Sequence, residues 1–275
     1  MAEVGNKPHF FLMNTIESVH CHHVVPGLAD AFRARYVRPS ALMTFLEEAA
    51  AEHCRAVGHD IFDLLEKGWG WVLVGGGLRM QTYPLYGEQI VIKTWISRWK
   101  GVSGIREYRI YRKDGTFLGE AGGRWAFWDA PKRKPQLVPD FFLESWPQGG
   151  DSPYSRLQGP QGILPIPKTS EIQGRCLSQQ RFSVRRGEVD MYDHLHNTIY
   201  LDWMLESVPE HLYREELPMA MGLEFSGEAR RGDVIEFSTW PMKEGWIHDV
   251  RRLSDGKRVA RGYSEWTQNT LAIGA

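Results

Sequence analysis

The side chains best suited to proton transfer in this chain lie in its second half. Asp190 and His194 are four residues apart and directly precede a predicted helix, and Glu228 ends a predicted strand. Such side chains act as general acids, general bases or nucleophiles when a fold brings them together. Each also has a plainer explanation, since an aspartate before a helix is often a cap and a strand-end glutamate is often solvated. Whether they form a site depends on the elements that position them.

Other patterns that carry chemistry are weak. No Gly-x-Ser-x-Gly motif occurs, and Gly75–Gly77 is not followed by Lys-Ser or Lys-Thr, so we expect a bulge or room for a ligand there rather than a phosphate loop. Cys21, Cys54 and Cys176 form no Cys-x-x-Cys pair. Adjacent residues of His20–His23 would alternate across a strand and could not converge on one ion. We expect neither a metal nor a cofactor.

Composition indicates an ordinary globular protein. Of 275 residues, 42% are hydrophobic and 24% charged, and the net charge of -1 gives no global field that favours nucleic acid. The apolar run Phe10–Met13 is far too short for a membrane span or a signal segment. Scattered cysteines suit a reducing compartment. We therefore expect a cytoplasmic protein without nucleic-acid partners, and the sequence leaves open whether it is a monomer or a homodimer.

A repeat divides the chain into two similar halves. Gly87–Trp95 matches Gly232–Trp240 at a constant spacing, and both segments alternate like strands. The turn signal Asp114-Gly115 recurs as Asp255-Gly256 at the corresponding place, and each predicts a hairpin. These matches predict two domains of like fold.

Each half has a predicted helix ahead of its strands. Apolar residues between Leu42 and His53 recur with helical spacing, with Ser40 available as a cap and Gly58 as a stop. In the second half a shorter helix is expected from Asn197, ended by Pro209. The first helix is amphipathic and should face the core.

About four strands follow each helix, over residues 70–129 and 217–268. Residues 130–169 hold eight of the 15 prolines, which is typical of a connector. The pattern predicts an α+β fold of two tandem hot-dog domains, each an antiparallel sheet wrapped around a central helix, with the sheets paired edge to edge. We place the N-terminal domain at 1–164, including the connector, and the C-terminal domain, with the candidate motif, at 165–275.

The sequence resembles the plant and bacterial acyl-ACP thioesterases, where ACP is acyl carrier protein, over residues 15–268. In the first half the similarity lies in Trp71–Glu88 and in Trp125–Asp129. In the second half Val189–Asn197 is similar to the family signature D-x-N-x-H-x-N-N, and Leu223–Glu228 is similar to its L-E-Y-x-x-E segment. This resemblance implies a double hot-dog fold, hydrolysis of fatty acyl groups carried as thioesters on ACP, and no cofactor.

Position by position, the family's aspartate, histidine and late glutamate fall on three residues of this chain, namely Asp190, His194 and Glu228. The asparagine between the aspartate and the histidine is Tyr192 here, and the first of the two later asparagines is His196, while the second is Asn197. Ala229 replaces the cysteine that follows the glutamate in many plant members, so a Cys-His mechanism is excluded there. We expect Glu228 with His194 to activate water, and Asp190 to orient the site or to attack as a nucleophile.

Tyr192 changes the chemistry of the predicted site. A phenol offers one hydroxyl on a rigid ring where asparagine offers an amide. If it points inward, it could donate to the thioester oxygen or position water; otherwise it is packing. The residues expected to bind the acyl group are one polar and three apolar side chains, namely Asn197, Trp69, Trp71 and Met80.

The catalytic residues do not decide the carrier. An acyl-CoA thioesterase, a non-hydrolytic acyl-binding protein and a hot-dog dehydratase are the alternatives to an acyl-ACP hydrolase. Because ACP is acidic, basic clusters are candidates for docking it, namely Lys132–Lys134, Arg185-Arg186, Arg230-Arg231 and Arg251-Arg252.

Overall fold

The computed structural model describes residues 18–33, 35–146, 165–172 and 174–268. The first half contains β1 (His20–Val24), β2 (Ala31–Phe32), β3 (Tyr36–Val37), β4 (Trp69–Met80), β5 (Ile90–Lys100), β6 (Ser103–Arg112), β7 (Phe117–Asp129) and β8 (Lys134–Pro135), with helices α1 (Pro39–Ala56), α2 (Ile61–Glu66) and α3 (Asp140–Ser145). The second half contains β9 (Ser178–Ser183), β10 (Glu216–Phe225), β11 (Val234–Pro241), β12 (Trp246–Arg252) and β13 (Arg258–Gln268), with α4 (Asn197–Glu206) and α5 (Glu210–Glu215). Three short 3-10 turns complete the set, namely Leu28–Asp30, Thr169–Glu171 and Arg186–Glu188.

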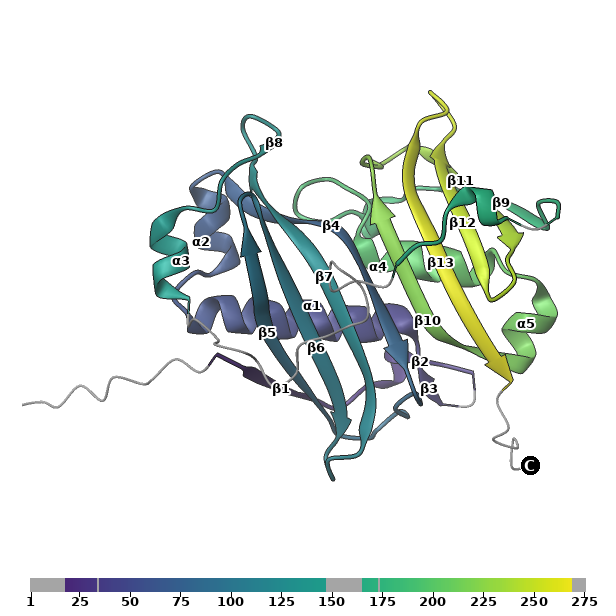
Figure 1. The fold of residues 1–275 in the computed structure, drawn as a ribbon, viewed down its shortest axis with the longest axis horizontal. Coiled ribbons are helices and arrows are strands. Elements are labelled where there is room, and N and C mark those ends of the chain that lie inside the picture. Colours follow the sequence, from purple (N-terminus) through teal and green to yellow (C-terminus); the bar gives the residue numbers. More distant parts are fainter. Residues whose placement is uncertain (1–17, 34, 147–164, 173, 269–275) are drawn as a thin grey trace, which may run out of the picture.

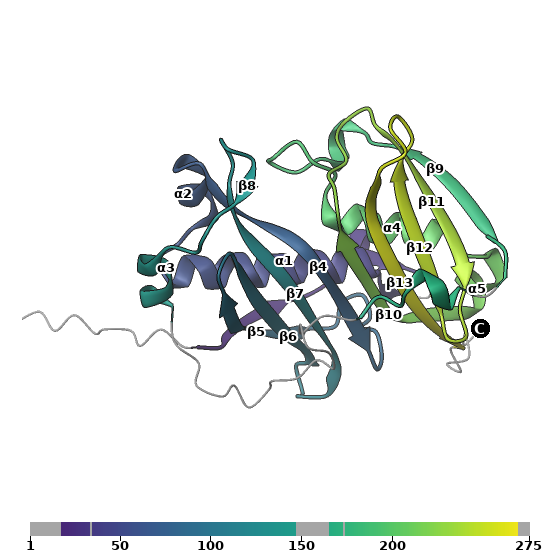
Figure 2. The same ribbon diagram turned by 45° about the horizontal axis from the view of Figure 1, so that its top comes forward.

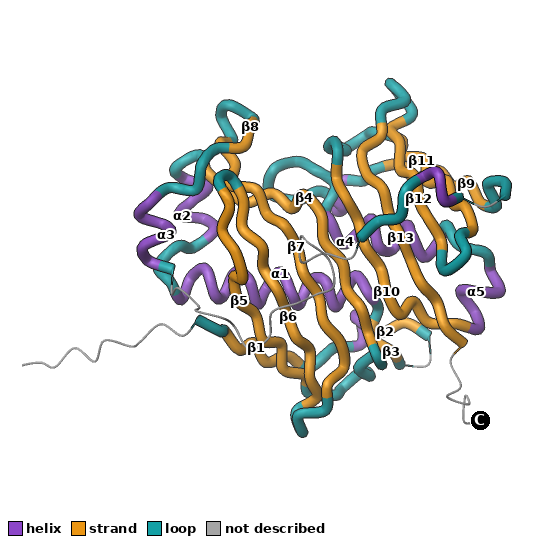
Figure 3. The backbone as a smooth tube through the Cα atoms, viewed as in Figure 1, coloured by secondary structure: helices purple, strands orange, loops and turns teal. Residues whose placement is uncertain are grey.

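One antiparallel sheet runs through both halves (Figure 1). Its order is β1, β5, β6, β7, β4, β10, β13, β12, β11 and β9, with β8 added beside β7 to make 11 strands among the described residues. Helices α1 and α4 cross behind the strands of their own halves (Figures 1 and 2). Figure 3 shows the remaining helices at the ends of the sheet. The predicted α+β architecture of two paired hot-dog sheets is confirmed.

The two halves meet at the pairing of β4 with β10, where the glycine run lies. Gly75 and Gly77 pair with Glu224 and Gly222 across this junction. The register of β4 against β7 shifts between Leu73 and Gly75, which confirms the expected bulge. The edges that each half would expose are thus joined into one sheet.

The central helices follow the predicted pattern with two corrections at their ends. Helix α1 buries the predicted apolar face and stops ahead of Gly58, which has φ 83°. Ser40 is not its cap: Arg38 holds that position and Pro39 begins the helix, because proline needs no N–H partner there. The second helix ends at Glu206, before Pro209, which instead precedes α5.

The predicted connector is partly a core element. Pro139 caps the short helix α3, and the aromatic side chains of Phe142 and Trp146 are buried against Trp71 and Trp99. The prolines flank this helix and do not interrupt it, so a high proline content does not exclude a core element in this segment. The rest of the connector, 147–164, lies outside the described residues, and the boundary at residue 165 stays a prediction.

The second half repeats the turns of the first. Gly87 and Gly232, which precede β5 and β11, have φ of 79° and 88°. Gly115 and Gly256, in the hairpins before β7 and β13, have φ of 89° and 66°, a conformation that glycine adopts readily. No described helix is long and apolar enough to cross a membrane.

Candidate active site

A cavity of about 260 Å³ lies inside the first half, between α1 and the strands in front of it. Its apolar lining includes aromatic and aliphatic side chains of the first half, namely Ile61, Trp71, Ile96, Trp99, Trp125, Phe142 and Trp146. The loop before α4 supplies part of the lining from the second half, with Asp190, Tyr192, His196 and Asn197. Glu47 on α1 lies beside this loop. The cavity therefore combines an apolar interior with a polar end that both halves build.

Only one of the three predicted apolar contacts lines this cavity. Trp71 does so, whereas Trp69 packs against Phe127 and Phe141 with ring centroids 5.8 and 5.9 Å apart. Met80 is buried in the core around α1, at the far end of the long strand β4. Contrary to expectation, Trp69 and Met80 therefore do not line this cavity. Both lie on the same strand as Trp71, but that strand extends well beyond the cavity.

Asp190 holds the shape of the loop before α4. Its Oδ1 accepts hydrogen bonds from the backbone N–H groups of Tyr192 and His194, at 2.8 and 3.0 Å. The Asp190 N–H donates in turn to the His194 carbonyl at 2.7 Å. Asp193 completes the turn with φ 61°. This geometry suits the orienting role considered for Asp190.

Tyr192 reaches across to the first half. A methyl group added at Gly70 would lie 2.1 Å from the Tyr192 hydroxyl, so the ring is seated where only glycine leaves room. That hydroxyl is buried and has no hydrogen-bond partner among the described residues. Burial, followed by the charge of Asp190, raises the pKa of Tyr192, so the phenol keeps its proton. A buried hydrogen-bond donor without a partner destabilises the protein unless a ligand accepts its hydrogen bond.

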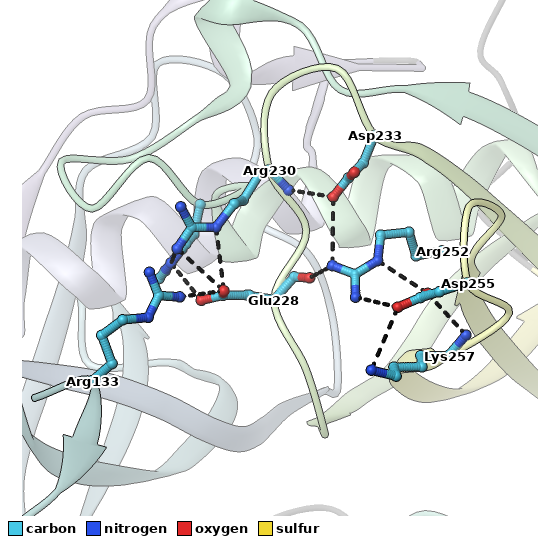
Figure 4. Close-up of polar contacts among 8 residues, drawn as sticks. Arg133, Glu228, Arg230, Asp233, Arg252, Asp255 and Lys257 are labelled. Carbon is cyan, nitrogen blue, oxygen red and sulfur yellow. Dashed lines mark hydrogen bonds and ion pairs between the residues drawn. The ribbon is translucent and has the colours of Figure 1, made fainter.

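His194 and Glu228 form a second pair close by. His194 Nε2 lies 2.7 Å from Glu228 Oε2. The other carboxylate oxygen contacts Arg133 and Arg230, the latter at 3.1 Å, as Figure 4 shows. Burial acts to raise the pKa of Glu228, but the Arg230 hydrogen bond and the charges of His194, Arg230 and Arg133 together lower it. The carboxylate is therefore ionised and held by two guanidinium groups. Neither His194 nor Glu228 is among the residues that line the cavity.

Sequence reasoning missed Glu47. Asn197 Nδ2 donates to Glu47 Oε1 at 3.3 Å, and His196 Nε2 lies 3.5 Å from Oε2. Burial raises the pKa of Glu47, and the charges of Asp190 and Glu48 act in the same direction, against His196 and Asn197. The residue lies off the apolar stripe of α1 and looks like part of a solvated face in the sequence, so only the tertiary structure identifies it.

The loop before α4 has a backbone counterpart before α1. Equivalent N–H and carbonyl groups form the same bonds in both, namely Val37 N to Pro84 O and Leu195 N to Ala229 O at 2.9 and 2.8 Å, and Arg38 N to Asp30 O and His196 N to Glu188 O at 2.8 Å each. The residues with positive φ also correspond, at Arg35 with 73° and Asp193 with 61°. The repeat thus extends into the loop that carries the candidate motif.

The side chains of the two loops differ at every candidate position. Counterparts are Phe32 for Asp190, Tyr36 for His194, Arg38 for His196, Pro39 for Asn197, and Tyr83 for Glu228. Tyr36 and Tyr83 are buried, and the Tyr83 hydroxyl donates to the Pro218 carbonyl at 2.5 Å. Only the second half has side chains at these positions that can be ionised at neutral pH, namely Asp190 in the loop before α4 and Glu228 after β10.

The histidine-rich segment binds a carboxylate. His20 and His22 lie on one face of β1 and contact Glu52 Oε2 at 3.1 and 2.8 Å, whereas Cys21 is exposed. No group of three or more metal-binding side chains is found in the described part of the chain.

Family models match most of the chain. The model of the acyl-ACP thioesterase N-terminal domain matches residues 28–146, and that of the C-terminal domain matches residues 174–268. Among curated relatives, a chloroplastic acyl-(acyl-carrier-protein) hydrolase of Cuphea viscosissima is 27% identical over 261 residues, covering 85% of this chain. A chloroplastic palmitoyl-acyl carrier protein thioesterase of Arabidopsis thaliana is 24% identical over 249 residues, covering 83%. The chain spans 59% of the length of each of these relatives.

Solved structures share the fold over nearly their whole length. An acyl-ACP thioesterase from Bacteroides thetaiotaomicron superposes with a TM-score of 0.73 at 19% identity, covering 91% of this chain and 98% of that one. A 12:0-ACP thioesterase from Umbellularia californica superposes with a TM-score of 0.74 at 18% identity, covering 92% and 98%.

Proposed function

Since the chain belongs to the acyl-ACP thioesterase family, we propose that it hydrolyses fatty acyl groups carried as thioesters on ACP, releasing the free acid and the carrier thiol. The observation that carries this proposal is the aromatic cavity whose polar end bears Asp190, Tyr192 and Asn197 from the candidate motif. An apolar pocket with a few convergent polar groups is the usual form of a small-ligand site. No cofactor is needed for the reaction.

The acyl group would occupy the apolar interior and present its thioester to the polar end. At the start of α4 the Thr198 N–H already donates to His196 Nδ1 and the Ile199 N–H to the His196 carbonyl, so the Tyr192 hydroxyl is the proposed donor to the oxyanion. Asp190 would hold the loop in place. His194, positioned by Glu228, would take part in activating water, although the lowered pKa of Glu228 makes that carboxylate a weak base on its own.

Three exposed cations are available for docking ACP. Most of the candidate basic side chains are already in ion pairs, as with Arg185 and Glu188 or Arg252 and Asp255. Within the described residues, Lys134, Arg186 and Arg231 are exposed and have no ion-pair partner. An acidic carrier would find these charges unsatisfied, so they are the proposed docking set.

The carrier and the chemistry are tested by one assay. Thiol release should be measured for a panel of acyl-ACP and acyl-CoA substrates, and we expect kcat/KM to be higher for acyl-ACP. A higher kcat/KM for acyl-CoA would instead identify CoA as the carrier of the acyl group. Binding of acyl-ACP without thiol release would show a non-hydrolytic binding protein, the alternative motivated by Tyr192.

Compartment and assembly remain predictions. The cysteines Cys21, Cys54 and Cys176 are all free, which fits a cytoplasmic protein, although the curated relatives named above are chloroplastic. A homodimer is the other expectation, and light scattering on the purified chain would decide it.

A further inference from the structure

We propose that Glu47, on the central helix of the first half, is a catalytic residue that acts as the general base toward the attacking water. This inference rests on the proposed thioesterase function. It assigns the chemistry to a carboxylate outside the motif, contributed by the half of the chain that otherwise supplies the apolar interior.

Position is the first argument. Glu47 lines the cavity together with Asp190 and Tyr192, and its two oxygens face Asn197 and His196 across the junction of the halves. Its side chain is 21% exposed, so a water molecule can reach it from the cavity while most bulk solvent is excluded. A base must lie within hydrogen-bond reach of the water that it deprotonates, directly at the reacting group.

Charge is the second argument, and it separates Glu47 from Glu228. Glu228 is held by Arg133 and Arg230, and these cations stabilise its ionised form. Glu47 makes no ion pair with lysine or arginine among the described residues, and its neighbours His196 and Asn197 are weaker partners. A carboxylate that is less stabilised as an anion is the better proton acceptor.

The titratable groups that face Glu47 come from three elements. Asp190 and His196 approach it from the loop before α4, and Glu48 is its neighbour on α1. Tyr108 and the cavity-lining Arg106 lie on β6. Burial raises the pKa of the Tyr108 phenol, the charge of Arg106 lowers it and Glu47 raises it further, so the phenol stays protonated. Burial raises the pKa of Glu47, with Asp190 and Glu48 adding to that effect and His196 opposing it. The pKa of Glu47 is therefore higher than the value near 4.3 of an ordinary glutamate.

The chemical step balances without a further reactant. Water oxygen forms a bond to the thioester carbonyl carbon while the Glu47 carboxylate accepts one water proton. The carbonyl electron pair moves to oxygen and returns as the carbon–sulfur bond breaks. Sulfur leaves with that bonding pair and takes the proton from Glu47, so the products are the free acid and the carrier thiol.

The repeat supplies a third argument. Counting from the caps Arg38 and His196, the residue on α4 equivalent to Glu47 is Leu205, which is buried. Glu47, the polar helix residue, thus lies opposite the polar loop before α4. Its apolar counterpart Leu205 is the equivalent residue opposite the loop that carries Phe32. The two features belong together as one composite site.

The test compares Glu47→Gln with Glu52→Gln. The amide oxygen of glutamine can still accept from Asn197, so the structure should persist while the base is lost. We expect kcat on acyl-ACP to fall at least about a hundredfold in Glu47→Gln, with little change in KM, and less than about threefold in Glu52→Gln, which lies on the same helix but outside the cavity lining. The acid limb of the wild-type pH–rate profile should disappear in Glu47→Gln and persist in Glu47→Asp, which serves as the second variant if glutamine prevents folding.

Each outcome decides between explanations. Glu47→Gln that turns over within threefold of wild type, with the acid limb unchanged, overturns the inference and leaves the thioesterase proposal standing. Equal losses in Glu47→Gln and Glu52→Gln also overturn it, since the loss of any carboxylate on α1 would then explain both. Wild type that releases no thiol from any acyl thioester overturns the thioesterase proposal and the inference with it.

Discussion

The loop before α1 and the loop before α4 share a backbone and differ in the side chains that matter. Both form the same pair of hydrogen bonds to a neighbouring strand turn and to a preceding 3-10 turn. One then carries Asp190 and His194, and the other carries Phe32 and Tyr36. The duplicated scaffold therefore does not itself produce a site, and the chemistry depends on a few side chains that differ between the copies.

The comparison also explains why both halves are needed. The cavity lies in the first half, but its polar end comes from the loop of the second half and from Glu47. At the equivalent position after β4, where the other copy has Glu228, the buried Tyr83 donates to the Pro218 carbonyl. One loop has become packing, and the other has kept ionisable groups.

The largest expected effect is the loss of the two motif carboxylates. Asp190→Ala and Glu228→Ala should each lower turnover at least about a hundredfold, with little loss of stability. The matched change in the other copy, Tyr83→Phe, removes only a hydrogen bond, so it should lower stability by about 1 kcal/mol and leave turnover unchanged. Steady-state thiol release and thermal melts measure both quantities.

Near-normal hydrolysis in both folded carboxylate variants would contradict the site. Asp190→Asn is the control for the loop, because its side-chain oxygen can still accept from Tyr192 and His194.

Tyr192 should have the next largest effect. Because Tyr192 lines the polar end of the cavity and its hydroxyl is buried against Gly70 without a partner, Tyr192→Phe should lower turnover about tenfold or more. Tyr192→Asn should be more active than Tyr192→Phe, because it returns the family's amide. Tyr36→Phe, in the other loop at the position equivalent to His194, is the control for removing a phenol hydroxyl outside the cavity lining. If Tyr192→Phe behaves as wild type across acyl chain lengths, the hydroxyl is structural.

Carrier docking should give a smaller, salt-dependent effect. Raising the ionic strength should lower activity on acyl-ACP but not on a short acyl-thiol analogue, because exposed charges are screened over about 8 to 10 Å near physiological salt. Replacing Lys134 or Arg231 with alanine should flatten the acyl-ACP salt curve. Equal salt curves for the two substrates would remove the docking argument.

The smallest expected effect is that of Arg133, which links the first half to Glu228. Both side chains are more than a third exposed, so Arg133→Ala should lower stability by less than about 1 kcal/mol. The pKa of Glu228 is lowered on folding, so its ion pairs stabilise the protein above the unfolded carboxyl pKa near 4.3 and are lost as pH falls through the folded value. Denaturant melts between pH 3 and pH 7 test this, and a large loss at neutral pH would contradict it.

Local patterns were sufficient to predict the repeat, the hairpin turns and the first central helix. Asp-Gly signals and alternating apolar residues are set by neighbours in the chain, and the structure confirms them at Gly115 and Gly256. The motif around Asp190 is identified as a candidate site by its resemblance to the family signature.

Features that depend on packing between distant segments could not be predicted. The burial of Phe142 within a proline-rich stretch requires the aromatic wall of the first half. Glu47 has no signal in its spacing, since its partners Asn197 and His196 are far away in sequence. Met80 was placed wrongly because strand alternation indicates which face a residue takes but not how far along the strand the cavity extends.

Exchange of the two loops' side chains tests the account most directly. The variant Asp190→Phe/His194→Tyr/His196→Arg gives the loop before α4 the residues with which its copy already folds. Thiol release from acyl-ACP should fall at least about a hundredfold while the variant remains folded and still binds the acyl carrier. Release within threefold of wild type would contradict the claim that the chemistry depends on the side chains of this loop.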